Sequence, residues 1–372
     1  SSNIRIINQW KDNHKITTGL SAEYQNNDID GISFMIPAFE LFTAGGYLLH
    51  EWKVNNNLQV SGGLRYDRAI LKTESYYDWF PTQGIFLQRA EKLDKSFGSF
   101  SGMLGANYHS GKSIFRINLG RSFRIPLAKE LAANGINYHR FSYEVGDPSL
   151  QPEIAWQLDM GAEYATPLWQ ARISPFISYF PNYLYLNPGF EFDFSSGAGN
   201  QVFYYTGSEV FRWGGEFTFM IEPVKNLIID FSAEYVYSEQ LDGAKKGFTI
   251  PFSPPASLLT EFGWNPWGEQ KFSKLRFLSF SLETRFTMPQ NRIVPPEKKT
   301  DGYNVFSAGV GGKGFLYGNK FDWRFRVNNL FDTHYLEHTS HYRLIGVPEP
   351  GRNFTFSVNI PFEIIQSKEN NT

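Results

Sequence analysis

Apolar and polar residues alternate one by one over most of this chain, a pattern that predicts β-strands with two unlike faces. In the segment SIFRINLGRSFR (113–124), one face carries Phe115, Ile117, Leu119 and Phe123. The opposite face of that segment carries Arg116, Asn118, Ser122 and Arg124. The alternation recurs in EIAWQLDMGAEY (153–164), FDWRFRVNNLF (321–331) and RNFTFSVNIPF (352–362). The two faces of each strand therefore require different surroundings.

The whole pattern predicts about fifteen strands. They lie near 3–11, 14–25, 40–54, 57–71, 98–110, 113–124, 153–165, 169–186, 201–222, 225–238, 254–265, 273–289, 302–314, 320–331 and 351–362. Most exceed the roughly five or six residues typical of strands in soluble proteins, and they reach the roughly 9–11 residues that cross a bilayer. The last strand is expected to end at the aromatic residue Phe362.

The connections between these strands alternate between short and long. The long ones are 26–39, 72–97, 125–152, 187–200, 239–253, 290–301 and 332–350. Outer-membrane barrels have short periplasmic turns and long extracellular loops, whereas a soluble meander has no reason to put every long loop at one end. The predicted fold is therefore all-β, a transmembrane antiparallel β-barrel.

Composition agrees with this class. The chain has 9 Trp, 20 Tyr and 35 Phe, which suits the aromatic girdles of a barrel. No stretch reaches the roughly 18 apolar residues of a membrane-spanning helix. A net charge of −2 without a basic run argues against nucleic acid as a partner, and the absence of cysteine excludes thiol chemistry.

Fifteen strands cannot close a bacterial barrel, which has an even strand number. Either one strand is miscounted, or further strands lie on sequence upstream. The chain starts at Ser1 in strand-like sequence, without an initiator Met or a signal peptide. We therefore expect a processed product or a fragment.

Two motifs carry a family resemblance. The segment around 122–153, SFRIP…KEL…NG…YEVGDPSLQPE, resembles the region of the FRAP and NPNL boxes of TonB-dependent outer-membrane receptors. The segment 327–362, which begins VNNLFD and contains PGR, resembles the closing signature of that family. The resemblance covers essentially all 372 residues.

The resemblance implies a 22-strand barrel with a plug domain, of which residues 1–372 would be the C-terminal part. The plug, the first strands and the segment that binds TonB would lie upstream. It implies an active importer of a scarce nutrient in the outer membrane of a Gram-negative bacterium, most simply of a ferric siderophore or another iron complex. Its partners would be the N-terminal part of the receptor, TonB, outer-membrane lipid and lipopolysaccharide.

The loops expected to be extracellular supply the candidate ligand-binding residues, because binding residues concentrate on loops held by a rigid scaffold. They are Tyr138, His139, Arg140, His334, His338 and His341. A histidine between the two boxes resembles the haem ligand of haem-importing members. The spacing of the last three histidines would place them on one face of a helix, where imidazole suits Zn²⁺ or Cu²⁺, but a polar aromatic loop surface is the simpler interpretation. No metal or required cofactor is assigned.

Three functions remain open: active import, passive diffusion through a porin-like channel, and the anchoring of an enzyme or adhesin in the outer membrane. No catalytic constellation is visible, so an enzyme is not expected. A passive porin-like channel would need a complete barrel of 16 to 18 strands. An adhesin anchored by the barrel would need a long passenger. Within the family, siderophores, haem, zinc and other ligands stay possible.

Overall fold

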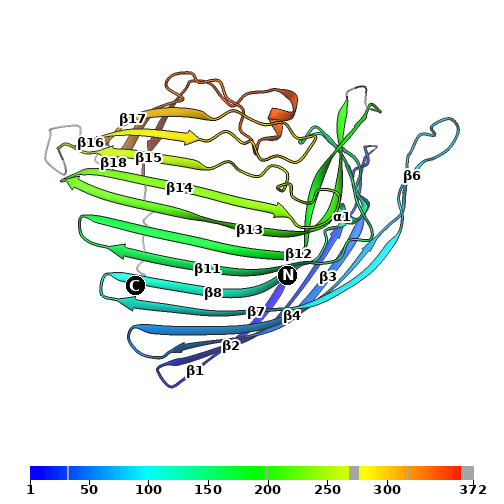
Figure 1. Ribbon diagram of the computed structural model, residues 1–372, viewed down its shortest axis with the longest axis horizontal. Coiled ribbons are helices and arrows are strands. Elements are labelled where there is room, and N and C mark those ends of the chain that lie inside the picture. Colours follow the sequence, from blue (N-terminus) through cyan, green and yellow to red (C-terminus); the bar gives the residue numbers. More distant parts are fainter. Residues whose placement is uncertain (32, 196, 198, 268–275, 317–318, 362–372) are drawn as a thin grey trace, which may run out of the picture.

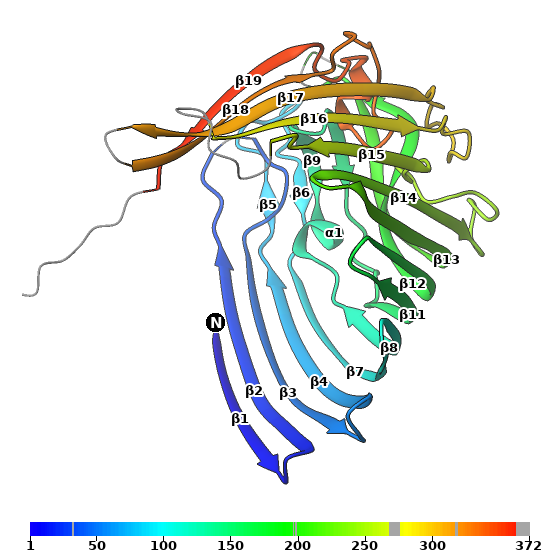
Figure 2. The same ribbon diagram turned by 90° about the vertical axis from the view of Figure 1, so that its left-hand side faces the viewer.

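The computed structural model describes residues 1–31, 33–195, 197, 199–267, 276–316 and 319–361. Most of the chain forms one large curved sheet with the shape of a trough (Figures 1 and 2). This sheet has 17 strands, of which β9 and β10 are short and come from a single connection. The other fifteen long strands confirm the predicted all-β fold.

The long strands follow one another in chain order, and each is antiparallel to its neighbour. They are β1 (Ser2–Trp10), β2 (His14–Asn27), β3 (Phe39–Lys53), β4 (Leu58–Thr73), β7 (Leu93–Ser110), β8 (Ser113–Arg124), β11 (Glu153–Ala165), β12 (Trp169–Asp193), β13 (Asn200–Val224), β14 (Leu227–Gln240), β15 (Ser257–Trp264), β16 (Arg276–Thr287), β17 (Tyr303–Leu316), β18 (Asn319–Asn328) and β19 (Asn353–Asn359). The predicted end of the last strand at Phe362 falls outside the described residues, as do residues 268–275 and 317–318.

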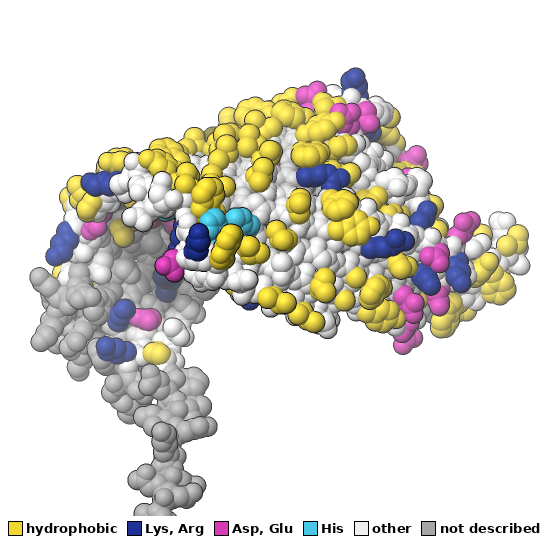
Figure 3. Space-filling view, turned by 90° about the horizontal axis from the view of Figure 1, so that it is seen from below, with side chains coloured by type: hydrophobic (Ala, Val, Ile, Leu, Met, Phe, Trp, Pro, Cys, Tyr) yellow, Lys and Arg dark blue, Asp and Glu magenta, His cyan; other side chains and the backbone are white. Residues whose placement is uncertain are grey.

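The two faces of the sheet differ as the alternation predicts. The convex face is apolar, and large side chains such as Leu64, Phe100 and Leu104 are exposed on it. Figure 3 shows hydrophobic side chains spread over the side of the molecule seen from below. The concave face carries charged residues that pair across strands, as between Glu163 and Arg172 (2.8 Å).

The two ends of the sheet differ in the length of the connections between strands. At the short-turn end, tight turns contain residues with positive φ, such as Lys11 (54°), Gly111 (58°) and Asn226 (66°). The opposite, long-loop end carries the long connections. Strands β12 and β13 extend furthest there, and β12 runs seven residues beyond its predicted end at 186.

The long connections contain small elements that the alternation did not predict. They are β5 (Tyr76–Tyr77), β6 (Gln88–Ala90), α1 (Ala128–Ala132), β9 (Asn134–Asn137), β10 (Ser142–Val145) and the 3₁₀ helix η1 (His341–Ile345). Among the described residues, no helix has the length and apolar character needed to cross a membrane.

The connection 125–152 folds inward and is more than the plain hairpin connection expected between two strands. Its helix α1 buries Leu131 in a cluster with Leu71, Phe97, Leu184 and Tyr205 of the surrounding strands. Leu71 and Phe97 lie on the concave side, so the connection covers the inner face of the trough at the long-loop end (Figure 2). Burial of these apolar side chains makes the folded connection lower in free energy than an extended surface loop.

Candidate ligand-binding site at the long-loop end

The connection 125–152 is anchored where it leaves and rejoins the sheet. The guanidinium of Arg124, at the end of β8, lies 2.7 Å from the Glu130 carboxylate and 3.3 Å from that of Glu153. Glu130 also accepts a hydrogen bond from the backbone N–H of Leu127 (2.8 Å). The base of the connection is therefore fixed by one cation and two carboxylates.

From this base, strands β9 and β10 form a hairpin whose tip carries three of the predicted site residues. Tyr138 is 60% exposed and His139 is also exposed, so both side chains are available to a ligand. The hairpin is held by its second strand, which pairs in parallel with the extension of β13.

A buried carboxylate stabilises this pairing. Glu144 in β10 is fully buried, and it accepts hydrogen bonds from the Tyr205 hydroxyl (2.6 Å) and the Asn137 amide (2.8 Å). The Arg140 guanidinium lies 4.0 Å from the same carboxylate. No sequence pattern pointed to Glu144, because its partner Tyr205 is distant along the chain.

The hairpin tip lies against η1, which belongs to the connection between β18 and β19. The rings of Phe141 and Tyr342 are 5.8 Å apart, and those of His341 and Phe252 are 4.8 Å apart. Burial, followed by the nearby charges of Arg140 and Arg343, lowers the pKa of His341. The structure therefore brings together Arg140 and His341, two of the predicted site residues.

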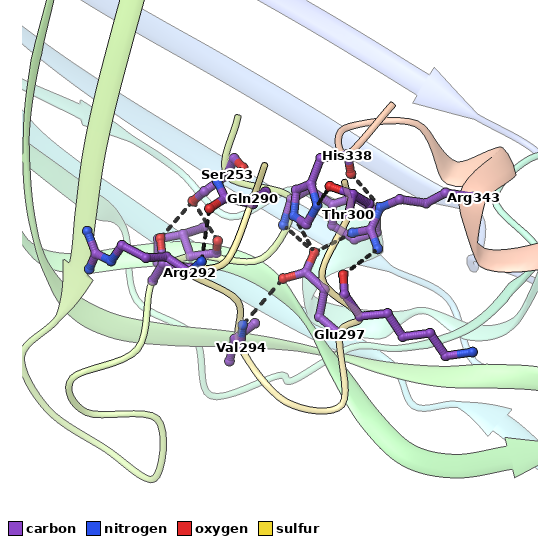
Figure 4. Close-up of polar contacts among 12 residues, drawn as sticks. Ser253, Gln290, Arg292, Val294, Glu297, Thr300, His338 and Arg343 are labelled. Atoms are coloured by element: carbon purple, nitrogen blue, oxygen red, sulfur yellow. Dashed lines mark hydrogen bonds and ion pairs between the residues drawn. The ribbon is translucent and has the colours of Figure 1, made fainter. Parts of the chain in front are cut away.

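His338 has a different place, within a buried polar cluster that joins three long connections (Figure 4). Its Nδ1 lies 2.9 Å from the Thr300 hydroxyl, and its Nε2 lies 3.4 Å from the Glu297 carboxylate. Arg343 forms an ion pair with the same carboxylate, and its guanidinium lies 4.7 Å from the centre of the Phe252 ring.

This cluster shifts the titration of its carboxylate. Burial alone would raise the pKa of Glu297, but His338, the Phe252 N–H at 2.9 Å and Arg343 together bring that pKa below its ordinary value. Glu297 therefore stays ionised and holds the connections 239–253, 290–301 and 332–350 together.

The three histidines of the last connection do not share one helical face. His334 is exposed in a segment without regular structure, His338 is buried and His341 opens the short η1 helix. Just before His334, the Asn329 side chain accepts a hydrogen bond from the Thr333 N–H (2.8 Å) and donates one to the Thr333 carbonyl (2.9 Å), which fixes the loop backbone there. Within the described ranges, no group of three or more His, Cys, Asp or Glu residues is arranged to hold a metal ion.

A second junction, unforeseen from the sequence, fixes the other side of the mouth. The Asn134 side chain binds the Tyr143 hydroxyl (2.6 Å) and the Arg89 carbonyl (3.0 Å). Arg89 pairs with Asp78 (2.9 Å), so the arm that contains β5 and β6 is tied to the connection 125–152.

Comparison with known proteins now places the chain. The family model "TonB dependent receptor-like, beta-barrel" matches residues 4–330. Among solved structures, the fold is similar to "Copper transporter OprC" at 20% sequence identity with a TM-score of 0.77, covering 97% of this chain and 56% of that chain.

Two further structures give the same result. The FrpB iron transporter from Neisseria meningitidis is 14% identical, with a TM-score of 0.67 and coverage of 96% of this chain and 54% of that chain. The Serratia marcescens hemophore receptor HasR, in complex with its hemophore HasA and heme, is 18% identical, with a TM-score of 0.64 and coverage of 97% and 58%. At these identities the likeness shows the fold alone, and this chain spans little more than half the length of each protein. Because the family model covers most of its sequence, the chain belongs to the TonB dependent receptor-like β-barrel family.

Proposed function

We propose that residues 1–372 form the C-terminal part of an outer-membrane barrel that imports a scarce nutrient with energy delivered by TonB. Family membership and the apolar convex face support a position in a bilayer. On this proposal the long-loop end is extracellular and the short-turn end is periplasmic. In this proposal the chain forms part of the barrel wall of a receptor and is not an enzyme.

The N-terminal part of the same receptor is the partner that this arrangement requires. In the described residues, β1 pairs only with β2 and β19 pairs only with β18, so each has one unpaired edge. An open edge cannot be satisfied in hydrocarbon, and seven further strands would close the barrel. A plug would fill the trough, whose concave charges are suited to a polar neighbour.

The mouth cluster carries the ligand proposal. It consists of Tyr138, His139 and Arg140 at the hairpin tip with His341 and Tyr342 of η1. The cluster combines a guanidinium, two imidazoles and aromatic rings, which suits an anionic iron complex such as a ferric siderophore or haem. His334 is exposed and can contribute from the loop surface, whereas buried His338 supports η1 from behind.

In this mechanism the chain holds the ligand and TonB supplies the work. The hairpin tip and η1 bind the ligand from outside, and the fixed bases of both connections keep these side chains in position. Force transmitted from TonB to the plug would then open a path along the concave wall. The barrel itself supplies one half of the binding site.

Binding by the purified full-length receptor tests the ligand class. Haemin and a ferric tris-catecholate would be titrated against the wild type, Arg140→Ala and Tyr138→Ala, with Asp12→Ala at the short-turn end as the control. We expect the two mouth variants to weaken binding by about tenfold, the effect of losing roughly 1.4 kcal/mol. If the wild type binds neither probe, the iron assignment is wrong while the family assignment remains.

Haem is the second candidate, because the exposed imidazole of His139 at the hairpin tip is a suitable iron ligand. A Soret shift on adding haemin that disappears in His139→Ala but persists in His334→Ala would favour haem. A passive channel is distinguished by uptake in cells: dissipating the proton gradient abolishes TonB-driven import and leaves diffusion through a porin unchanged.

A further inference from the structure

A cation interrupts the apolar pattern of the convex face in β8. Along β8, the residues Phe115, Ile117 and Leu119 are all exposed on that face. The next position in phase is Arg121, which pairs in register with Gly102 of β7 and Trp156 of β11. A cation thus stands where the alternation calls for an apolar residue.

The surface beside Arg121 is hollowed into a groove of about 510 Å³. Gly62 and Gly102 leave its floor without side chains, and its walls come from apolar neighbours. The main wall residues are Leu64, Phe100, Leu104, Leu119 and Trp156. The volume falls within the roughly 300–1,000 Å³ of small-molecule sites, and its lining is almost entirely apolar.

Arg121 stands at this groove without a carboxylate partner. Its Nη1 donates to the Ser99 hydroxyl (3.2 Å) and to the Phe100 carbonyl, and its guanidinium lies 5.8 Å from the Trp156 ring centre. On the opposite face of the same strand, Arg116 and Arg124 both pair with glutamates. In the part of the chain that the structure describes, no such ion pair is formed by Arg121.

The position of Arg121 along β8 indicates which membrane leaflet would supply an anionic partner for it. It lies three positions before Arg124, where β8 ends and the long connection begins. At about 3.3 Å per residue, the guanidinium can reach the polar boundary at the long-loop end while its stem stays against apolar surface.

We propose that the groove and Arg121 form a binding site for a lipid of the outer leaflet that carries a phosphate beside its acyl chains. An acyl chain lies in the groove over Gly62 and Gly102, and the phosphate accepts charge-assisted hydrogen bonds from Arg121. Lipid A, the membrane anchor of lipopolysaccharide, has this chemistry. The site rests on the membrane position and orientation given under the proposed function, but not on any ligand of the mouth.

The test measures lipid that remains bound to the full-length receptor after purification from outer membranes in mild detergent. Mass spectrometry counts lipid A per receptor for the wild type, Arg121→Gln and Arg121→Lys. Arg68→Gln is the matched control, because Arg68 is exposed on the same face of β4 but does not line the groove. Gly102→Ala fills the floor, where the added Cβ would meet Leu64 Cδ2 at 3.1 Å.

We expect Arg121→Gln to lower retained lipid A about fivefold, the effect of one basic side chain near an anionic surface. Arg121→Lys should restore much of it, Gly102→Ala should lower it with the charge intact, and Arg68→Gln should leave it unchanged. When lipopolysaccharide is added back to wild-type receptor that has lost its lipid, the phosphorylated form should bind the groove again. The dephosphorylated form should not.

Retention that is equal in the wild type and Arg121→Gln overturns the site. Equal losses in Arg121→Gln and Arg68→Gln, or retention of phosphatidylglycerol in place of lipid A, overturn it as well. Haemin and catecholate titrations of Arg121→Gln keep the two proposals apart, since neither Arg121 nor the apolar groove walls belong to the mouth cluster. A wild type that is absent from outer-membrane fractions would refute the proposed function itself.

Discussion

Glu297 illustrates what a single buried side chain does in this molecule. Its carboxylate faces Arg343, His338 and two backbone N–H groups, those of Phe252 and Val294. Arg343 has almost no access to solvent, so its charge depends on this one carboxylate. An unpaired buried cation is far more costly than an exposed one.

Glu297→Gln is therefore expected to destabilise the packing of η1 by about 3–5 kcal/mol, the cost of breaking a buried ion pair from one side. Hydrogen exchange of residues 288–302 and 329–350 in the full-length receptor would report it as faster exchange. Asp301→Asn, the same chemical change at an exposed position of the same connection, is the control. Unchanged exchange in Glu297→Gln would contradict the role of the cluster.

His341 gives the mouth a dependence on pH. Its pKa is lowered in the folded state, so the unfolded segment binds a proton more readily as the pH falls below about 6.5. Stability from neutral His341 is present above that pH and is lost as the pH falls toward the lowered value. The charges that face it are Arg140, Arg343 and Glu144.

We expect protection of residues 339–346 to fall between pH 7.5 and 5.5, after correction for intrinsic exchange. His341→Gln, which cannot titrate, should remove this dependence while the protection of β8 stays constant. A dependence that persists in His341→Gln would assign the effect to another group.

At the scale of the elements, the long strands were predictable because two local signals agree. In β8 and β11, the period of two and the neighbouring turns fix both ends, and the predicted spans 113–124 and 153–165 match the structure. The strand β12 runs past its predicted end because it pairs with β13 beyond the barrel, a contact that no local pattern reveals.

The small elements were missed for the same physical reason. Strands β9 and β10 have four residues each, too few to show a period. They form through contacts with distant parts of the chain. Strand β10 pairs with β13, and the Asn134 N–H donates a hydrogen bond to the Met35 carbonyl (3.0 Å). The sequence therefore predicted Tyr138, His139 and Arg140 as loop residues but not the hairpin that presents them.

Gly135 in β9 tests how closely this hairpin packs. A Cβ at that position would lie 1.9 Å from the Phe34 carbonyl oxygen, a backbone atom that cannot move alone. Gly135→Ala should therefore destabilise the hairpin by about 1–3 kcal/mol, the usual cost of overpacking. Limited proteolysis of the connection 125–152 would show faster cleavage. Gly263→Ala is the control, because no atom lies within 4 Å of its added Cβ.

At the scale of the whole molecule, the open trough sets what the chain can do alone. The outer edges of β1 and β19 are rows of backbone groups without partners in the described sheet. Each unsatisfied group costs several kcal/mol in hydrocarbon, so these residues by themselves should not insert stably into a bilayer.

Expression with and without the upstream part of the receptor tests this. Residues 1–372 alone should remain extractable by urea. Together with the upstream strands that the proposed function requires, they should give a urea-resistant species that migrates faster before heating than after. A urea-resistant product from residues 1–372 alone would contradict the need for further strands.

The inward fold of residues 125–152 has an electrical consequence. Helix α1 covers the concave wall beside β4 and β7, and the hairpin tip reaches across to η1 on the far side of the mouth. A barrel emptied of its plug would therefore keep a constriction at this end. Its single-channel ionic conductance should stay below that of an open pore with the same strand number, and it should rise when residues 134–145 are replaced by a short glycine linker.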